Sequence, residues 1–295
     1  MEFSLVHFAI PAFLLAIALE LGLTRRWRLR GYEARDTAAS LAMGVGNVLI
    51  NLASQWIKLP LLALLYEHRL FDLGHGPLAW VAVFVVEDFT YYWFHRASHE
   101  VRFLWAAHVN HHSSERYNLS TALRQSWTTP FTTFLFYWPL PLLGFDPFLI
   151  LTATSVSLLY QFWIHTECID RLGWLERWFN TPSHHRVHHG SNLEYLDRNH
   201  GGILIAWDRW FGTFEAEQAP VRYGLTKNIE TFYPWHIAFH EWRAIGRDLQ
   251  RARNWRERLG YIFAAPGWSP DGSTQTARQL RQPVVSGSVG SSLAV

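Results

Sequence analysis

Four long blocks of this 295-residue chain carry very few charged side chains. They cover residues 4–23, 37–66, 77–93 and 130–164. A helix that crosses a bilayer needs about 20 consecutive apolar residues, so each block is a candidate for one or two membrane spans. The pattern predicts an all-α integral membrane bundle of about 4–5 spans. A soluble protein with buried helices is the alternative, and the long uncharged runs disfavour it.

The ends and interruptions of these blocks refine the prediction. The first block lacks the charged start and small-residue cleavage site of a signal peptide, so we expect a membrane anchor. Pro60 lies inside the second block, which is therefore either one long span or a span followed by a half-helix. Residues 144–147 read GFDP, a turn signal in the middle of the fourth block. That block predicts a tight helical hairpin with two short legs.

Histidine is concentrated in the middle of the chain, in three motifs. On a helix, residues three or four apart lie on the same face, so each motif gathers its imidazoles on one side. Neutral imidazole is a good ligand for iron, zinc and copper. The eight imidazoles are too many for one ion and fit a dimetal site. The motifs are His95-x3-His99, His108-x2-His111-His112 and His185-x2-His188-His189.

The remaining side chains limit the kind of metal site. Cys168 is the only cysteine, which excludes a four-cysteine zinc site and a cysteine-held iron–sulfur cluster within the chain. A metal site made of neutral imidazoles is more positive than one made of carboxylates. We therefore expect nearby carboxylates that balance this charge and orient the rings. Glu87, Asp88, Glu167 and Asp170 are candidates for this role, and the alternative for each is an ordinary charge at a helix end.

The segments around the motifs resemble those of the fatty acid hydroxylase/sterol desaturase superfamily, which are membrane enzymes with a non-haem di-iron centre. Residues 87–96 (EDFTYYWFHR) and 179–189 (FNTPSHHRVHH) are similar to the segments that hold its first and third histidine boxes. Residues 199–202 (NHGG) and 207–214 (WDRWFGTF) resemble the branch that contains alkylglycerol monooxygenase. The resemblance covers about residues 80–217.

The resemblance implies that the eight histidines of the motifs bind two non-haem iron ions. It implies a ninth ligand, His165, which matches a histidine found at the end of a span in that branch. His200 stands where relatives often carry tyrosine. The resemblance therefore leaves three roles for His200, which are metal ligation, hydrogen bonding and contact with the substrate. We expect six residues to surround the ligands or to complete the set, namely His184, His200, Glu87, Asp88, Glu167 and Asn199.

The resemblance also implies the reaction. Such an enzyme uses O2 and external electrons to hydroxylate or desaturate a C–H bond of a lipid, which can be a sterol, a fatty acyl chain or an alkyl-ether lipid. The chain carries neither a dinucleotide-binding glycine motif nor a P-loop, so we expect an external redox partner. The net charge of +2 gives no indication of nucleic-acid binding.

Two other classes of protein also use several histidines within a membrane. A histidine-lined metal transporter carries its histidines within the spans, whereas these motifs follow the spans. A haem-binding electron carrier needs about two axial histidines for each haem, which does not explain two pairs of adjacent histidines. Both remain alternatives to the oxygenase.

Charges also suggest an orientation and a domain plan. Arginines follow the first block, so this loop is expected in the cytoplasm by the positive-inside rule. Alternation of the spans then places all the histidine motifs on the cytoplasmic face. We expect one catalytic domain over residues 1–265, with its core at 80–217, and a disordered tail over 266–295. The arginines of the loop are Arg25, Arg26, Arg28, Arg30 and Arg35.

A basic segment over residues 241–259 has apolar residues at helical spacing. Such a helix can lie in the headgroup plane of a membrane with its apolar face down. A solvated helix packed on the catalytic domain is the alternative, and the sequence does not choose between them.

Overall fold

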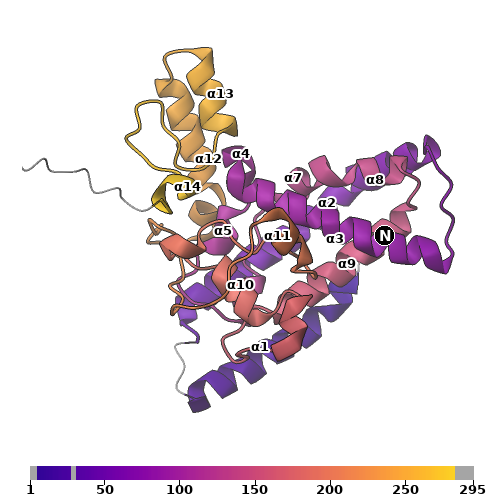
Figure 1. Cartoon of the computed structure of the whole chain (residues 1–295), viewed down its shortest axis with the longest axis horizontal. Coiled ribbons are helices and arrows are strands. Elements are labelled where there is room, and N and C mark those ends of the chain that lie inside the picture. The colour runs from indigo at the N-terminus through magenta and orange to yellow at the C-terminus, as the bar shows by residue number, and fades with distance from the viewer. Residues whose placement is uncertain (1–4, 28–30, 283–295) are drawn as a thin grey trace, which may run out of the picture.

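The computed structural model describes residues 5–27 and 31–282, and the regular elements there are helices. The one ladder contact within these ranges is an isolated antiparallel bridge between Phe179 and Leu204. Long helices lie together, and short helices gather beside them (Figure 1). The predicted all-α class is confirmed.

Helices α1 (Leu5–Trp27) and α2 (Ala34–Glu67) correspond to the first two apolar blocks. The Glu33 side chain caps α2 by accepting hydrogen bonds from the backbone amides of Arg35 and Asp36. This cap satisfies donors that the first turn of a helix leaves free. Pro60 lies inside α2, which continues through it, so the second block forms one long helix.

Both helices are long and apolar enough to cross a membrane, with mean hydropathies of 1.7 and 1.6. Only 22% of the apolar window of α1 and 11% of that of α2 are buried, whereas a core helix of a soluble protein is mostly buried. Large apolar side chains such as Leu15, Trp56 and Ile57 are exposed along them. Contiguous exposed apolar surface of this kind marks an interaction with a membrane or partner, and the two helices together indicate a membrane protein.

The third and fourth apolar blocks form four further helices around one core. They are α3 (Pro77–Glu100), α7 (Thr129–Tyr137), α8 (Pro139–Leu142) and α9 (Pro147–Trp163). The predicted hairpin is present, because Gly144 adopts φ 103° between α8 and α9. A Cβ atom there would lie 2.2 Å from the Phe71 carbonyl oxygen. Among the described helices only α1 and α2 meet the length and composition of a span, so the larger span count stays a prediction.

Two apolar clusters join these helices. In the first, Val83 of α3 packs with Leu149 and Ala153 of α9 and with Tyr137 of α7. In the second, α1 packs on α9 and on α6 (Leu119–Ala122). There the rings of Phe13 and Phe162 stack with centroids 4.0 Å apart. Burial of these side chains fixes α1, α3 and α9 as one unit.

A buried carboxylate adds a polar connection to α1. Glu20 accepts a hydrogen bond from the Leu119 backbone amide at 2.7 Å. It also accepts from the hydroxyls of Tyr32 and Thr166. Three donors compensate for the loss of water around this group. Glu20 thus holds α1 against the start of α6 and against the residue that follows His165.

Short helices gather beside the long ones, and we call this group the cap. Several of them lie near one another in the middle of the view (Figure 1). Each spans at most seven residues, so packing and not helix propensity holds it. The elements of the cap are α4 (Arg102–Trp105), α5 (Val109–His112), η1 (Gly173–Arg177), α10 (Pro182–His188), η2 (Leu193–Tyr195) and α11 (Ala206–Phe211).

The basic segment forms two helices instead of the single helix expected from its spacing. They are α12 (Pro234–Arg251) and α13 (Trp255–Phe263), and they project from the rest of the molecule as a hairpin (Figure 1). The chain turns at Ala252, and the Asn254 side chain caps α13 by accepting from the Glu257 amide. An N-cap asparagine is a strong start signal, and it interrupts the apolar periodicity.

Part of the predicted tail is structured. Residues 266–282 include α14 (Ala277–Leu280), and the Arg281 guanidinium donates to the Leu196 carbonyl oxygen. Residues 283–295 lie outside the described residues, as do residues 1–4 at the start of the first block and Arg28 and Arg30 of the basic loop. The prediction of a disordered tail therefore stays a prediction for residues 283–295.

Candidate metal centre

Nine histidines from four segments converge in the cap. His95 and His99 lie on the last turns of α3, and His165 comes two residues after the end of α9. The other six belong to α5 and α10 or cap these helices. All are buried except His108, which is partly buried. These six are His108, His111, His112, His185, His188 and His189.

The nine imidazoles form two groups, within each of which the candidate ligand atoms all lie within 4.8 Å of one another. Group 1 consists of His95, His99, His108, His112 and His188. Group 2 consists of His111, His165, His185 and His189. The groups adjoin, because the rings of His112 and His189 stack with centroids 4.4 Å apart. In the described part of the chain neither group includes a carboxylate or the cysteine.

The two His-x-x-His-His motifs divide in the same way. The first and last histidines, four residues apart, enter one group and the middle histidine enters the other. His108 and His112 belong to group 1 and His111 to group 2, whereas His185 and His189 belong to group 2 and His188 to group 1. Helical side chains four residues apart share a face, and adjacent ones diverge. Each motif therefore contributes to both groups.

Within the groups the ring nitrogens are close together. The Nε2 atom of His108 lies 3.0 Å from that of His95 and 3.1 Å from that of His112. In group 2, the Nε2 atom of His165 lies 3.1 Å from that of His111 and 3.0 Å from that of His185. Several Nε2 atoms that approach one point suit a shared metal ion.

Backbone carbonyls set the tautomer of three rings. The Nδ1 atom of His95 donates to the His200 carbonyl oxygen at 2.8 Å, and that of His165 donates to the Gln161 carbonyl oxygen at 2.7 Å. The Nδ1 atom of His188 donates to the Arg198 carbonyl oxygen at 2.9 Å. A carbonyl oxygen only accepts, so the proton lies on Nδ1 and the Nε2 lone pair faces the group. Metal-bound histidines commonly have such partners.

Burial also favours the protonation state that ligation requires. Desolvation holds the pKa values of His111, His185 and His188 well below the ordinary value of 6.5, so these rings are neutral. Within residues 5–27 and 31–282, the buried Nε2 atoms of His99, His188 and His189 have no hydrogen-bond partner. An unpaired buried polar atom is costly, and a metal ion would satisfy these three. The residues present therefore fit two ions of a metal that accepts imidazole ligands.

Glu87 and Asp88 lie away from the groups. Glu87 accepts a hydrogen bond from the Tyr137 hydroxyl at 2.9 Å. Asp88 accepts from the Ile203 amide at 2.7 Å, and from the Leu204 amide and the Trp207 indole at 3.1 and 2.8 Å. Asp88 thus fixes the segment that follows His200, and among the described residues neither carboxylate is bonded to a grouped histidine.

Glu167, Asp170, Asn199 and His184 likewise have other partners. Glu167 accepts from the Tyr223 hydroxyl at 3.1 Å, and Asp170 lies 3.8 Å from Arg186. Asn199 donates to the His184 carbonyl oxygen at 3.0 Å, which holds the first turn of α10. The His184 ring faces the Phe179 carbonyl oxygen at 3.2 Å. These contacts support the elements that carry ligands rather than the ligands themselves.

His200 occupies an intermediate position. It is fully buried, and its ring centroid lies 5.0 Å from that of His99 and 5.7 Å from that of His188. Among the described residues, neither of its ring nitrogens has a hydrogen-bond partner. His200 does not belong to group 1, but its ring lies close to two histidines of that group.

The sequence did not reveal the groups that orient the rings. Asp197 places a carboxylate oxygen 3.6 Å from the Nδ1 atom of His99, and its φ of 51° is in a region that aspartate tolerates better than most residues. The other acceptors are the backbone carbonyls of Gln161, Arg198 and His200, which no side-chain pattern encodes. Asp197 is detectable only as an acidic residue between the third motif and His200.

Comparison with known proteins shows which family the chain is similar to. A family model described as fatty acid hydroxylase matches residues 80–213. The chain is 45% identical over 267 residues to an alkylglycerol monooxygenase of Homo sapiens, a match that covers 89% of this chain and 59% of the relative. Residues 80–213, which include all three histidine motifs, are thus similar to the fatty acid hydroxylase family. This confirms the resemblance seen in the histidine motifs.

Other relatives of this chain are also named for lipids. An alkylglycerol monooxygenase of Danio rerio is 43% identical over 81% of this chain and 54% of the relative. The ornithine lipid hydroxylase OlsE of Rhizobium tropici is 29% identical over 74% of this chain and 68% of the relative. The chain thus spans little more than half the length of the alkylglycerol monooxygenases it matches. No solved structure matches the chain.

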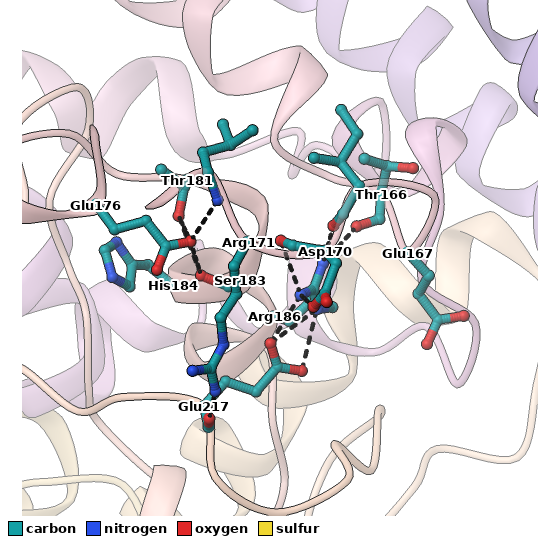
Figure 2. Close-up of polar contacts among 12 residues, drawn as sticks. Thr166, Glu167, Asp170, Arg171, Glu176, Thr181, Ser183, His184, Arg186 and Glu217 are labelled. Carbon is teal, nitrogen blue, oxygen red and sulfur yellow. Dashed lines mark hydrogen bonds and ion pairs between the residues drawn. The ribbon is translucent and has the colours of Figure 1, made fainter. Parts of the chain in front are cut away.

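A polar network supports the third histidine motif. Arg186, next to His185, donates to Glu217 at 2.7 Å and to the Ile169 and Thr166 carbonyl oxygens at 2.6 and 3.2 Å (Figure 2). Such charge-assisted bonds are stronger than neutral ones. Arg186 therefore ties α10 to the segment that follows His165, and so joins two sources of group 2 ligands.

A cavity of about 600 Å³ lies near group 2, although none of the nine grouped histidines is part of its wall. Its wall includes Tyr117, whose ring lies 5.1 Å from that of His189 and stacks on Tyr223 at 4.8 Å. Charged residues of both signs line the rest, among them Glu115, Arg116, Glu167, Arg222 and Glu230. A concave polar space beside the candidate ligands is a candidate binding site.

Proposed function

We propose that this protein is a membrane-embedded non-haem di-iron oxygenase that hydroxylates a C–H bond of a lipid with O2 and external electrons. The observation that carries the proposal is the division of nine imidazoles, eight of them buried and that of His108 partly buried, into two adjoining groups. The match of residues 80–213 to the fatty acid hydroxylase family and the relatives named as lipid oxygenases support the same reaction.

In this proposal group 1 and group 2 hold one iron ion each. The iron pair, when bound, supplies the reduction of O2 and the removal of hydrogen from an unactivated C–H bond. The chain's own residues hold the ring nitrogens in place through the carbonyls of Gln161, Arg198 and His200. Burial of the site limits the access of water. The unpaired ring nitrogens of His200 are available to hydrogen-bond a group at the site.

An alkyl-ether lipid is the first substrate to test, because the relatives at 45% and 43% identity are alkylglycerol monooxygenases. Hydroxylation of the carbon next to an ether oxygen leads to cleavage of the ether. The cavity beside Tyr117 is proposed to receive the polar end of the lipid. Its lining combines acidic residues with Arg116 and Arg222, so it suits a neutral hydroxyl-bearing end better than a phosphate.

The membrane arrangement completes the proposal. Arg25, Arg26 and Arg35 flank the loop between α1 and α2, which favours a cytoplasmic position for that loop and for the metal centre. We propose that α3 and the α7–α9 hairpin enter the membrane beside α1 and α2. Residues 1–265 are proposed to act as one catalytic domain, with electrons from an external donor.

The transporter and the haem carrier are not favoured. The grouped histidines lie in a closed cap and not along the exposed faces of α1 and α2. Nine imidazoles in two compact groups also exceed the two axial ligands of a haem.

Lipid profiling with isotopic oxygen tests the reaction. Cells that produce the wild-type protein or the His188→Ala variant are grown under ¹⁸O2, and their lipids are compared by mass spectrometry. We expect ¹⁸O-labelled products or cleaved ether lipids only with the wild type, and the exposed His236→Ala serves as the matched control. Equal labelled products from wild type and His188→Ala would overturn the proposed site, and their absence from both in cells rich in ether lipids would overturn the proposed substrate.

A further inference from the structure

The α12–α13 hairpin lies against the cap ends of the long helices. The Arg102 amide, just after α3, donates to the Ala264 carbonyl oxygen, just after α13, at 3.0 Å. The Trp242 indole of α12 donates to the Thr128 hydroxyl, at the start of α7, at 3.3 Å. Ile237 of α12 also packs in an apolar cluster with residues near the start of α2. The α12–α13 hairpin therefore lies beside the end of α3 and the starts of α2 and α7.

One face of α13 is apolar and exposed. Trp255, Leu259 and Phe263 have exposed fractions of 65%, 44% and 59%. They are four residues apart, so they form a continuous stripe along the helix. Three adjoining exposed apolar side chains are unusual on a surface that faces water.

The opposite face of α13 contacts the protein. The Tyr261 ring lies 5.5 Å from that of Trp268, and the Arg102 guanidinium lies 5.9 Å from the Tyr261 ring. Gly260 lies so close to Trp268 that a Cβ atom there would approach its ring to 2.3 Å. This side fixes the rotation of α13, so its apolar stripe points away from the rest of the protein.

Positive charges border the stripe. Arg256 and Arg258 follow Trp255 by one and three residues, so they project on the two sides of the stripe. Arg251 and Arg253 precede α13, and all four arginines are exposed. The Glu257 carboxylate is engaged at the helix start, where it accepts from the Arg253 amide at 2.7 Å. The accessible face of α13 is thus apolar in the middle and basic at its edges.

We propose that α13 lies in the headgroup layer of a bilayer that contains anionic lipids. Trp255, Leu259 and Phe263 insert toward the acyl chains, and Arg256 and Arg258 contact lipid phosphates. An apolar stripe between basic edges is typical of interfacial helices, and the contacts with the ends of α3 and α7 place the hairpin at the required depth. The proposal rests on membrane embedding and not on the reaction.

Single-site spin labelling tests the proposal on the full chain in lipid nanodiscs. Cys168, the only native cysteine, is replaced by serine, and a nitroxide is attached at Leu259→Cys or Phe263→Cys. The control is Gln250→Cys, an exposed polar position on α12 of the same hairpin. Collisions with O2, which concentrates in lipid, are compared with collisions with a water-soluble nickel complex.

We expect the labels at 259 and 263 to favour O2 and the label at 250 to favour the nickel complex. In Arg256→Gln and Arg258→Gln backgrounds, the O2 preference at 259 should lose its dependence on anionic lipid. Equal nickel access at 259 and 250 would overturn the proposal. So would shielding of position 259 from both reagents, since a second copy or a protein partner then covers the stripe. Circular dichroism of each variant checks that the helices are intact.

Discussion

His188 and His189 are consecutive residues at the end of α10, yet the imidazole of His188 belongs to group 1 and that of His189 to group 2. Their ring centroids are 5.3 Å apart and the ring planes are almost perpendicular, at 87°. Adjacent side chains on a helix diverge by about 100°, which directs one ring to each group. Since His111 and His112 are divided in the same way, each motif couples the two groups through one short helix.

Single alanine variants at this pair should separate the two metals. We expect anaerobically purified wild type to hold about two iron ions per chain, because imidazole sites of this kind accept iron. His188→Ala should lower the occupancy of group 1 and His189→Ala that of group 2, each leaving about one ion per chain. Elemental analysis gives the content, and Mössbauer spectra distinguish the ions.

His236→Ala is the control, because His236 is exposed on α12 and belongs to neither group. It should keep the wild-type metal content. Full occupancy with a single ion per wild-type chain would disprove the dinuclear centre. Zinc can replace iron in overexpressed protein, so both metals are measured.

The sequence predicted which histidines converge but not how they divide. The spacing of His108, His111 and His112 shows that they share a helical turn, but the group that each ring enters depends on how α5 faces α3 and α10. Tertiary packing decides that orientation, and the helix periodicity alone does not contain it.

Asp197 should tune the metal bound by His99. Its carboxylate oxygen lies 3.6 Å from the His99 Nδ1 atom, and loss of an outer partner typically weakens metal affinity by about 10–100-fold. Asp197→Asn should therefore lose iron from group 1 to a chelator about 10-fold more readily than wild type. Asp170→Asn is the matched control, because Asp170 is an exposed carboxylate near Arg186 and not near a histidine. Equal chelator sensitivity of the two variants would contradict this role.

The stability of the cap should depend on pH through Asp208. Burial raises the pKa of Asp208 from 3.8 to about 6, although the His200 and Gly201 amides and the Thr213 hydroxyl donate to its carboxylate. Because the folded-state pKa is higher than the ordinary one, the protonated form is favoured in the folded protein. This contribution is fully present below about pH 4 and is lost as the pH rises through about 6.

The buried histidines act in the opposite direction, because their pKa values are held below 6.5 in the folded protein. The contribution of Asp208 is therefore measured as a difference between two proteins in detergent. Asp208→Asn cannot ionise, so its unfolding temperature relative to that of wild type should rise between pH 5 and pH 7.5, whatever its absolute stability. Differential scanning fluorimetry measures both slopes. A variant with the same slope as wild type would show that another group controls the pH dependence.

The apolar blocks predicted the long helices well, because a long uncharged run has few other structures available. The break between α12 and α13 was missed, since the apolar spacing continues across Asn254 while its side chain caps a new helix. The role of Glu20 was also missed. A single acidic residue in an apolar helix does not indicate its partners, and those of Glu20 lie 12, 99 and 146 residues away in sequence.

Glu20→Gln should destabilise the junction between α1 and the cap. One carboxylate oxygen of Glu20 accepts from the Tyr32 hydroxyl and the Leu119 amide, and the other accepts from the Thr166 hydroxyl. Glutamine replaces one acceptor by an NH2 donor, which leaves a buried donor unpaired and costs about 1–3 kcal/mol. We expect a lower unfolding temperature and, because Thr166 follows His165, a larger loss of metal from group 2 than from group 1.

A double-mutant cycle with Tyr32→Phe separates this network from general damage to α1. The two substitutions act on the same hydrogen bond. The double variant should therefore lose less free energy of unfolding than the sum of the two single losses, by about 0.5 kcal/mol or more. Thr152→Ala on α9 is the control, because its hydroxyl donates to the Phe148 carbonyl oxygen of its own helix and not, in the described part of the chain, to another element. Strict additivity of Glu20→Gln and Tyr32→Phe, or an equal loss of metal from both groups, would show that Glu20 does not act through this junction.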